Sequence, residues 1–171
     1  SIKKTSGNET SVKYGYINKA GKQVLPFIYE EAGEFKNTAP DFYEAIVTKG
    51  FVPMLISKEG KDITYFPDID DDAIIAELQW VDESGSKLYV GIKESYHSTS
   101  YGVYSSFAAA FAVKPQYSEI QWVEEPNTGR EFFFVKKYKS LGLVRGCGDE
   151  IPAVYDHIQF NDTLVYAIDN I

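Results

Sequence analysis

Short apolar runs separated by polar, glycine-bearing turns recur along the whole chain. Residues 14–17 form one such run, and a turn containing Gly21 leads from it to a second apolar run that ends near Pro26. Glycine suits the positive φ of a short hairpin loop, and proline cannot donate a hydrogen bond to a neighbouring strand. The pattern therefore predicts a hairpin whose second strand ends at the proline.

Two further strands are predicted after each hairpin. A Tyr followed by an acidic or polar residue opens an alternating stretch, as in residues 117–123 and 155–160, and alternation of apolar and polar residues is typical of a strand. A fourth apolar run then closes each unit, at residues 43–47, 88–92, 132–135 and 164–168.

These elements recur in a unit of about forty residues. The prolines Pro26, Pro67, Pro115 and Pro152 keep this spacing, and the second copy is the weakest because it lacks the glycine of the first strand. We divide the chain, a single β-repeat domain over 1–171, into an N-terminal extension (1–13) and four units: 14–50, 51–94, 95–137 and 138–171.

Four short strands per unit predict an all-β fold. Such a unit cannot bury its apolar face alone, so neighbouring units must cover it. The array is compatible with a closed, propeller-like ring and with an open, twisted row of hairpins. Two segments interrupt the pattern: residues 94–100 are polar and predict an exposed loop, and residues 105–111 predict either a helical turn or a longer loop.

The first unit resembles the WG repeat of bacterial proteins. The resemblance rests on residues 14–26, which read YGYINKAGKQVLP, and on the following 29–35, YEEAGEF. Tyr14 stands where that repeat has its signature Trp, and Tyr101 and Leu141 take the place in later copies. The resemblance implies a repeated β scaffold, and it implies no common reaction, cofactor or catalytic residue.

Composition and charge narrow the classes of partner. The chain has 171 residues, 15% of them aromatic, and a net charge of −8. Residues 59–83 carry nine acids and one base, and a chain without a basic stripe repels phosphate backbones, so nucleic acid is not an expected partner. No apolar run has the length of a membrane span. Because the sequence opens on Ser1 without an apolar leader, any export signal was either removed or never present, and the compartment stays open.

A search for chemistry finds no complete catalytic or metal set. A single cysteine, Cys147, excludes an internal disulfide and a cysteine-based zinc site. Residues 68–72 imitate the start of a calcium loop, but Ala73 stands where that loop needs Gly and Gln79 where it needs Glu. Neither His97 nor His157 occurs in a pattern that predicts an activated Ser or Cys nucleophile. We therefore expect no catalytic residue and no cofactor, while a cation at 68–72 stays open.

The aromatic residues are the remaining functional signal. Rings exposed on a rigid β surface stack on sugars or anchor a protein partner. The candidates for contact with a partner are Trp80, Tyr96, Tyr101 and Trp122. The sequence thus favours a non-catalytic scaffold or binding module that presents loops, including the segment 95–101, to a protein or glycan. The alternative is a carboxylate-based hydrolase with its site at one end of the repeats.

Overall fold

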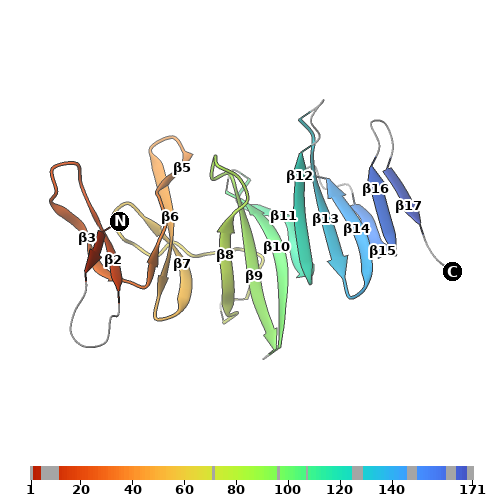
Figure 1. Cartoon of the computed structure of the whole chain (residues 1–171), viewed down its shortest axis with the longest axis horizontal. Coiled ribbons are helices and arrows are strands. Elements are labelled where there is room, and N and C mark those ends of the chain that lie inside the picture. Colours follow the sequence, from red (N-terminus) through yellow and green to blue (C-terminus); the bar gives the residue numbers. More distant parts are fainter. Residues whose placement is uncertain are drawn as a thin grey trace.

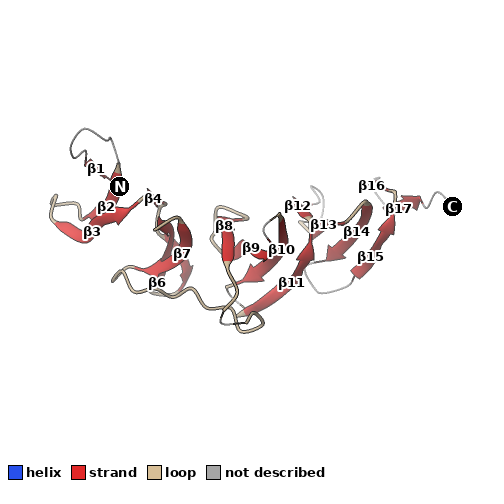
Figure 2. Cartoon of the chain, turned by 90° about the horizontal axis from the view of Figure 1, so that it is seen from below, coloured by secondary structure: helices blue, strands red, loops and turns tan. Residues whose placement is uncertain are grey.

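A row of small antiparallel sheets makes up the protein. The computed structural model describes residues 2–4, 12–70, 72–95, 97–106, 108–124, 129–145, 150–160 and 165–168, and within these ranges every regular element is a strand. The sheets stand one after another along the long axis, with the two chain ends at opposite ends of the row (Figures 1 and 2). Of the two arrangements that the repeat allowed, the structure is the open row. Over the described ranges there is no helix capable of crossing a membrane.

The described residues form five sheets, and all strand pairs in them are antiparallel. In chain order the strands are β1 (Ile2–Lys4), β2 (Lys13–Ile17) and β3 (Gln23–Tyr29); β4 (Glu31–Ala32), β5 (Lys36–Ala39), β6 (Phe42–Lys49) and β7 (Val52–Ser57); β8 (Ile75–Trp80), β9 (Lys87–Ser95), β10 (Ser98–Ser105) and β11 (Ala110–Tyr117); β12 (Glu119–Glu124), β13 (Glu131–Lys137), β14 (Ser140–Arg145) and β15 (Glu150–Tyr155); and β16 (His157–Phe160) and β17 (Val165–Ile168).

Sheets and sequence units are half a unit out of phase. The fourth sheet combines β12 and β13, the last two strands of the unit 95–137, with β14 and β15, the first two of the unit 138–171. The third sheet joins β8 and β9 to β10 and β11 in the same way, and in the second sheet β4 and β5 share the place of one strand beside β6. Each of these sheets therefore ties two sequence units together through backbone hydrogen bonds.

A glycine in the first strand and a proline in the second form one recurring structural motif. Between Tyr101 and Val103 the strand β10 advances two residues, while its partner β11 advances four, from Tyr117 to Val113. This bulge brings the backbone near Pro115 against Gly102, where an added Cβ would lie 2.7 Å from the carbonyl oxygen of Val113. A side chain has no room there, which explains the glycine physically.

The same bulge occurs in two other units. Gly15 faces the segment around Pro26, and Gly142 faces the segment around Pro152, each with backbone atoms within 2.9 Å of an added Cβ. The prediction that the proline ends the second strand is wrong, because Pro26 lies inside β3. Proline is tolerated there because a bulge needs no ladder hydrogen bond from its nitrogen.

The second unit departs from this motif. Met54 of β7 pairs with Val47 as Gly142 of β14 pairs with Val135, so it stands where the other units have the glycine, and its half-buried side chain packs against the core. The expected second strand near Pro67 is absent, and between Ser57 and Ile75 the described residues form only the isolated bridge Ile56–Asp62. Phe66 instead packs into the core, where its ring centroid lies 4.9 Å from that of Tyr104.

The core consists of three apolar layers between successive sheets. Tyr29 and Val47 belong to the first layer, and Tyr117, in the position equivalent to Tyr29, belongs to the third. Among the described residues, the buried side chains of the three layers are, in order along the row, Leu25, Tyr29, Ala45, Val47 and Ile56; Leu55, Phe66, Leu78, Leu88 and Val90; and Val103, Val113, Tyr117, Phe133, Val135 and Val144. The second and third sheets thus bury both faces against their neighbours, in keeping with the expectation that neighbouring units cover one another.

Two local predictions are corrected by the strand assignments. The polar stretch 94–100 is not a long loop, because β9 continues to Ser95 and pairs there with Ser98 of β10. Residues 105–111 do not interrupt the hairpin either, since Ser105 pairs with Ala110 across a short turn.

Candidate functional site

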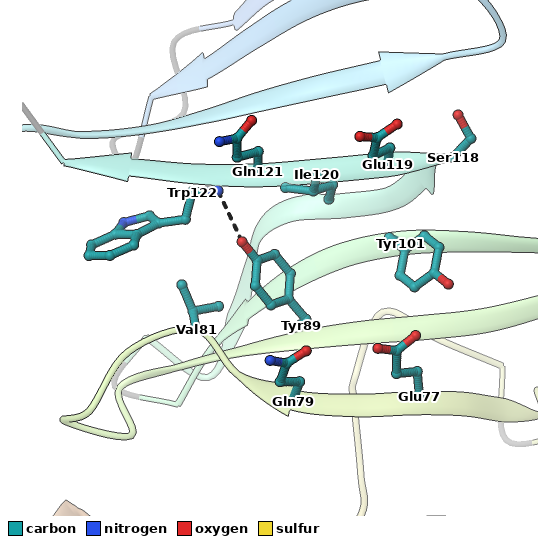
Figure 3. Close-up of a pocket in the computed structure, with 10 residues that line it drawn as sticks. All are labelled: Glu77, Gln79, Val81, Tyr89, Tyr101, Ser118, Glu119, Ile120, Gln121 and Trp122. Carbon is teal, nitrogen blue, oxygen red and sulfur yellow. Dashed lines mark hydrogen bonds between the residues drawn. The ribbon is translucent and has the colours of Figure 1, made fainter.

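A groove of about 450 Å³ lies between the third and fourth sheets. Strands β8, β9 and β10 of the third sheet line one side, and β12 of the fourth sheet lines the other (Figure 3). Aromatic, amide and carboxylate side chains alternate along it: Glu77, Gln79, Val81, Tyr89, Tyr101, Ser118, Glu119, Ile120, Gln121 and Trp122.

Strand register explains why the third sheet contributes these side chains. Glu77 of β8 and Tyr101 of β10 both pair with Gly91 of the strand between them, so all three lie in one row on one face. Because Gly91 has no side chain, the Tyr101 ring lies across it, and a Cβ at Gly91 would be 3.1 Å from Tyr101 Cε1. Burial, and after it the neighbouring Glu77 carboxylate, raises the pKa of the Tyr101 hydroxyl.

Tyr89 joins the two sides of the groove. Its hydroxyl oxygen accepts a hydrogen bond of 3.0 Å from the backbone N–H of Trp122, as Figure 3 shows. Burial raises the pKa of Tyr89, and the hydrogen bond from Trp122 opposes this shift. The indole Nε1 of Trp122 is buried and has no hydrogen-bond partner among the described residues, so packing alone holds the ring.

Strand β12 is the edge of its sheet on the groove side. It pairs with β13 on one edge, and its other edge has no strand partner within the described ranges. In an antiparallel strand the residues that bond a neighbour alternate with those whose main-chain groups face away. Since the N–H of Trp122 faces the groove, the main-chain groups of Ile120 face it as well.

The groove carries negative charge from both sheets. Glu77 comes from β8, and Glu119 comes from the start of β12 (Figure 3). Glu119 forms an ion pair with Lys136, with 3.1 Å between Nζ and Oε2, and its side chain is 67% exposed. In the described part of the chain, no Lys, Arg or His lines the groove.

Two of the four aromatic residues that the sequence singles out meet in this groove. Tyr101 and Trp122 line it from opposite sheets. Trp80 lies on the other face of β8 and packs against the apolar layer between the second and third sheets. Tyr96 lies outside the described residues, as does Cys147.

Sequence reasoning missed the groove's other polar residues. Gln79 and Gln121 each follow the alternation of their strand, and Tyr89 lies within a run that predicted only a strand. The available signal is strand alternation, which puts Glu77, Gln79 and Val81 on one face of the third sheet. It does not say which strand of another unit that face meets.

The other candidates for chemistry do not assemble a site. Within the described ranges no three His, Cys, Asp or Glu residues are grouped so as to hold a metal ion. Asp68, Asp70 and Asp72 are exposed on the connection before β8, and Asp71 lies outside the described residues. His97 is at the turn between β9 and β10, and His157 begins β16; neither lines the groove.

The architecture defines the protein as a β-repeat array with a groove between two of its sheets. Residues 14–37 match the family model for the WG containing repeat, so this part of the chain carries one such repeat. The matched residues include the Gly15 and Pro26 of the bulge described above. No curated protein matches the sequence, and no solved structure matches the fold.

Proposed function

We propose that this protein is a non-catalytic binding module that takes up a protein or glycan ligand in the groove between the third and fourth sheets. The observation that carries the proposal is the convergence of Tyr101 and Trp122 from different sheets on one groove. Rings offer large contact areas at a low cost in conformational entropy, and nearby amides supply orienting hydrogen bonds. The rest of the array acts as the scaffold that holds the two sheets in position.

A scaffold of this kind suits binding because its walls are rigid. The groove side of β9 rests on the buried layer that contains Val103 and Phe133, and the bond between Tyr89 and Trp122 fixes the distance across the groove. Side chains held on packed strands lose little freedom when a ligand arrives, so a larger share of the contact energy remains as affinity.

A carboxylate-based hydrolase is the second candidate, since Glu77 and Glu119 line the same groove. A glycosidase acid needs a desolvated surrounding that keeps its proton near neutral pH. Glu119 is mostly exposed and is paired with Lys136, which is the opposite surrounding. The third and fourth sheets, between which the groove lies, also stand inside the row and not at an end of it (Figure 1). Binding without turnover therefore agrees better with the geometry.

The proposal is tested by probing arrays of immobilised peptides and glycans with the wild type and with Tyr101→Ala. We expect ligands that the wild type captures and the variant loses, with no ligand converted. Tyr65→Ala is the matched control, because Tyr65 is exposed and lies outside the groove. Equal capture by wild type and Tyr101→Ala would place the binding site elsewhere, and turnover of a captured glycan would favour the hydrolase.

A further inference from the structure

The groove has the charge and the shape of a site for an organic cation. Figure 3 shows Tyr101 between Glu77 on one wall and Glu119 on the other, and none of the described residues that line the groove is cationic. Lys136 balances Glu119 only from the neighbouring strand β13. Among the described residues Glu77 forms no ion pair, so its charge is left for a ligand to neutralise.

The Tyr101 ring supplies a platform for such a cation. Gly91 allows the ring to lie across β9, with Glu77 beside its hydroxyl. A guanidinium group is planar, stacks on aromatic faces and donates hydrogen bonds in a fork that fits a carboxylate. One arginine side chain could therefore contact the ring and the Glu77 carboxylate together.

The unpaired edge of β12 indicates which kind of ligand should bear the arginine side chain. Main-chain groups of Ile120 face the groove, and the strand has no partner on that edge in the described part of the chain. An extended peptide completes such an edge with main-chain hydrogen bonds and directs alternate side chains into the groove. A sugar has no group in the regular spacing that this edge presents.

We propose that the groove binds an extended segment of a partner protein, which pairs with β12 at Ile120 and places an arginine side chain on Tyr101 beside Glu77. This rests on the proposed function and names the partner's chemistry. Tyr89, which occupies the N–H of Trp122, limits the pairing to the part of β12 before that residue. The bound segment is therefore short, and the arginine contributes most of the specificity.

The test uses the full chain and three peptides: acetyl-Thr-Val-Arg-Val-Thr-amide, the same peptide with citrulline for arginine, and the same peptide with glutamate there. Citrulline keeps the shape of arginine and removes its charge. By titration calorimetry we expect the citrulline peptide to bind about fivefold more weakly, the value of one cation–aromatic contact. The glutamate peptide should not bind. The amide signal of Ile120 should shift in an NMR titration with the arginine peptide.

Variants separate the parts of the site. Glu77→Gln and Tyr101→Leu should each weaken the arginine peptide about fivefold, and Tyr101→Phe, which keeps the ring, should retain most of the affinity. Glu34→Gln removes one exposed acid outside the groove and is the control for net charge. Thermal unfolding shows that each variant is folded.

Each outcome of these experiments either supports or overturns the arginine site. Equal affinity for arginine and citrulline peptides overturns the cation site. If glycans bind and are lost in Tyr101→Ala while all three peptides fail, the inference is wrong and the proposed function stands. If no array ligand and no peptide depends on Tyr101, both are wrong.

Discussion

The close approach of β11 to Gly102 makes a quantitative prediction about stability. In Gly102→Ala the new Cβ would lie 2.7 Å from the oxygen of Val113 and 2.8 Å from the nitrogen of Pro115. Both are backbone atoms of a paired strand, so the bulge itself must shift to admit the methyl group. Overpacking of this kind costs about 1–3 kcal/mol.

A compensating gain comes from the unfolded chain. Replacing glycine by alanine reduces the freedom of the unfolded state, which stabilises the fold by about 0.4–1 kcal/mol where the conformation allows it. The net loss expected for Gly102→Ala is therefore about 1–2 kcal/mol. For a chain of this length the melting temperature should fall by roughly 2–8 °C.

Gly91→Ala is the matched control because it makes the same change in the adjacent strand. Its nearest neighbours are side-chain atoms of Glu77, Tyr101 and Thr99 at 3.1–3.2 Å, which is a looser contact than the backbone atoms at 2.7–2.8 Å impose at Gly102. We expect a loss of less than about 1 kcal/mol in urea unfolding. If Gly102→Ala is as stable as Gly91→Ala, or more stable than the wild type, close backbone approach is not the reason for the glycine.

Three further predictions concern single side chains. Glu44 is buried, and burial raises its pKa, while a hydrogen bond with Thr38 opposes this shift. Because the folded state then holds the proton more tightly than the unfolded state, the stability of the fold falls as pH rises through the raised pKa. Glu44→Gln should therefore melt at a higher temperature than the wild type at neutral pH and lose this advantage below the ordinary pKa of 4.5. An unchanged melting difference across that range would contradict the assignment. Phe51 is 88% exposed with φ of 65° in a two-residue hairpin turn, so Phe51→Asn should raise the free energy of unfolding by about 1 kcal/mol, and a lower urea midpoint would refute the turn geometry. Tyr89→Phe leaves the N–H of Trp122 without its acceptor and should cost about 1 kcal/mol, with faster hydrogen exchange at the Trp122 amide; unchanged protection there would show that the bond does not hold the groove.

The half-unit offset between sheets and sequence units has a consequence for cooperativity. Because β13 and β14 belong to different units and share a ladder from Phe132 to Lys137, neither unit can unfold without breaking hydrogen bonds of the other. In linear arrays stability is set by units and by the contacts between neighbours. Backbone pairing across the unit boundary strengthens the contacts between neighbouring units. The array should therefore unfold in larger cooperative steps.

Local pattern determined the strands and their repetition. Alternation and turn residues placed the strands that end each unit, such as β6, β9 and β13, and the recurring Gly–Pro pair marked the equivalent hairpins. These features are local because side-chain period and turn chemistry act over a few residues. The absent strand near Pro67 shows the limit, since a proline at the right spacing does not replace the missing glycine at the position of Met54.

Only the tertiary structure decided how the strands are grouped and what the groove contains. The sheets join the second half of one unit to the first half of the next, and no local period distinguishes this grouping from its alternative. Tyr101 and Trp122 share a groove while Trp80, one residue from Gln79 of that groove, points to the opposite face. Adjacent strand residues face opposite sides of a sheet, so the site depends on which sheet packs on which face, and long-range packing alone sets that.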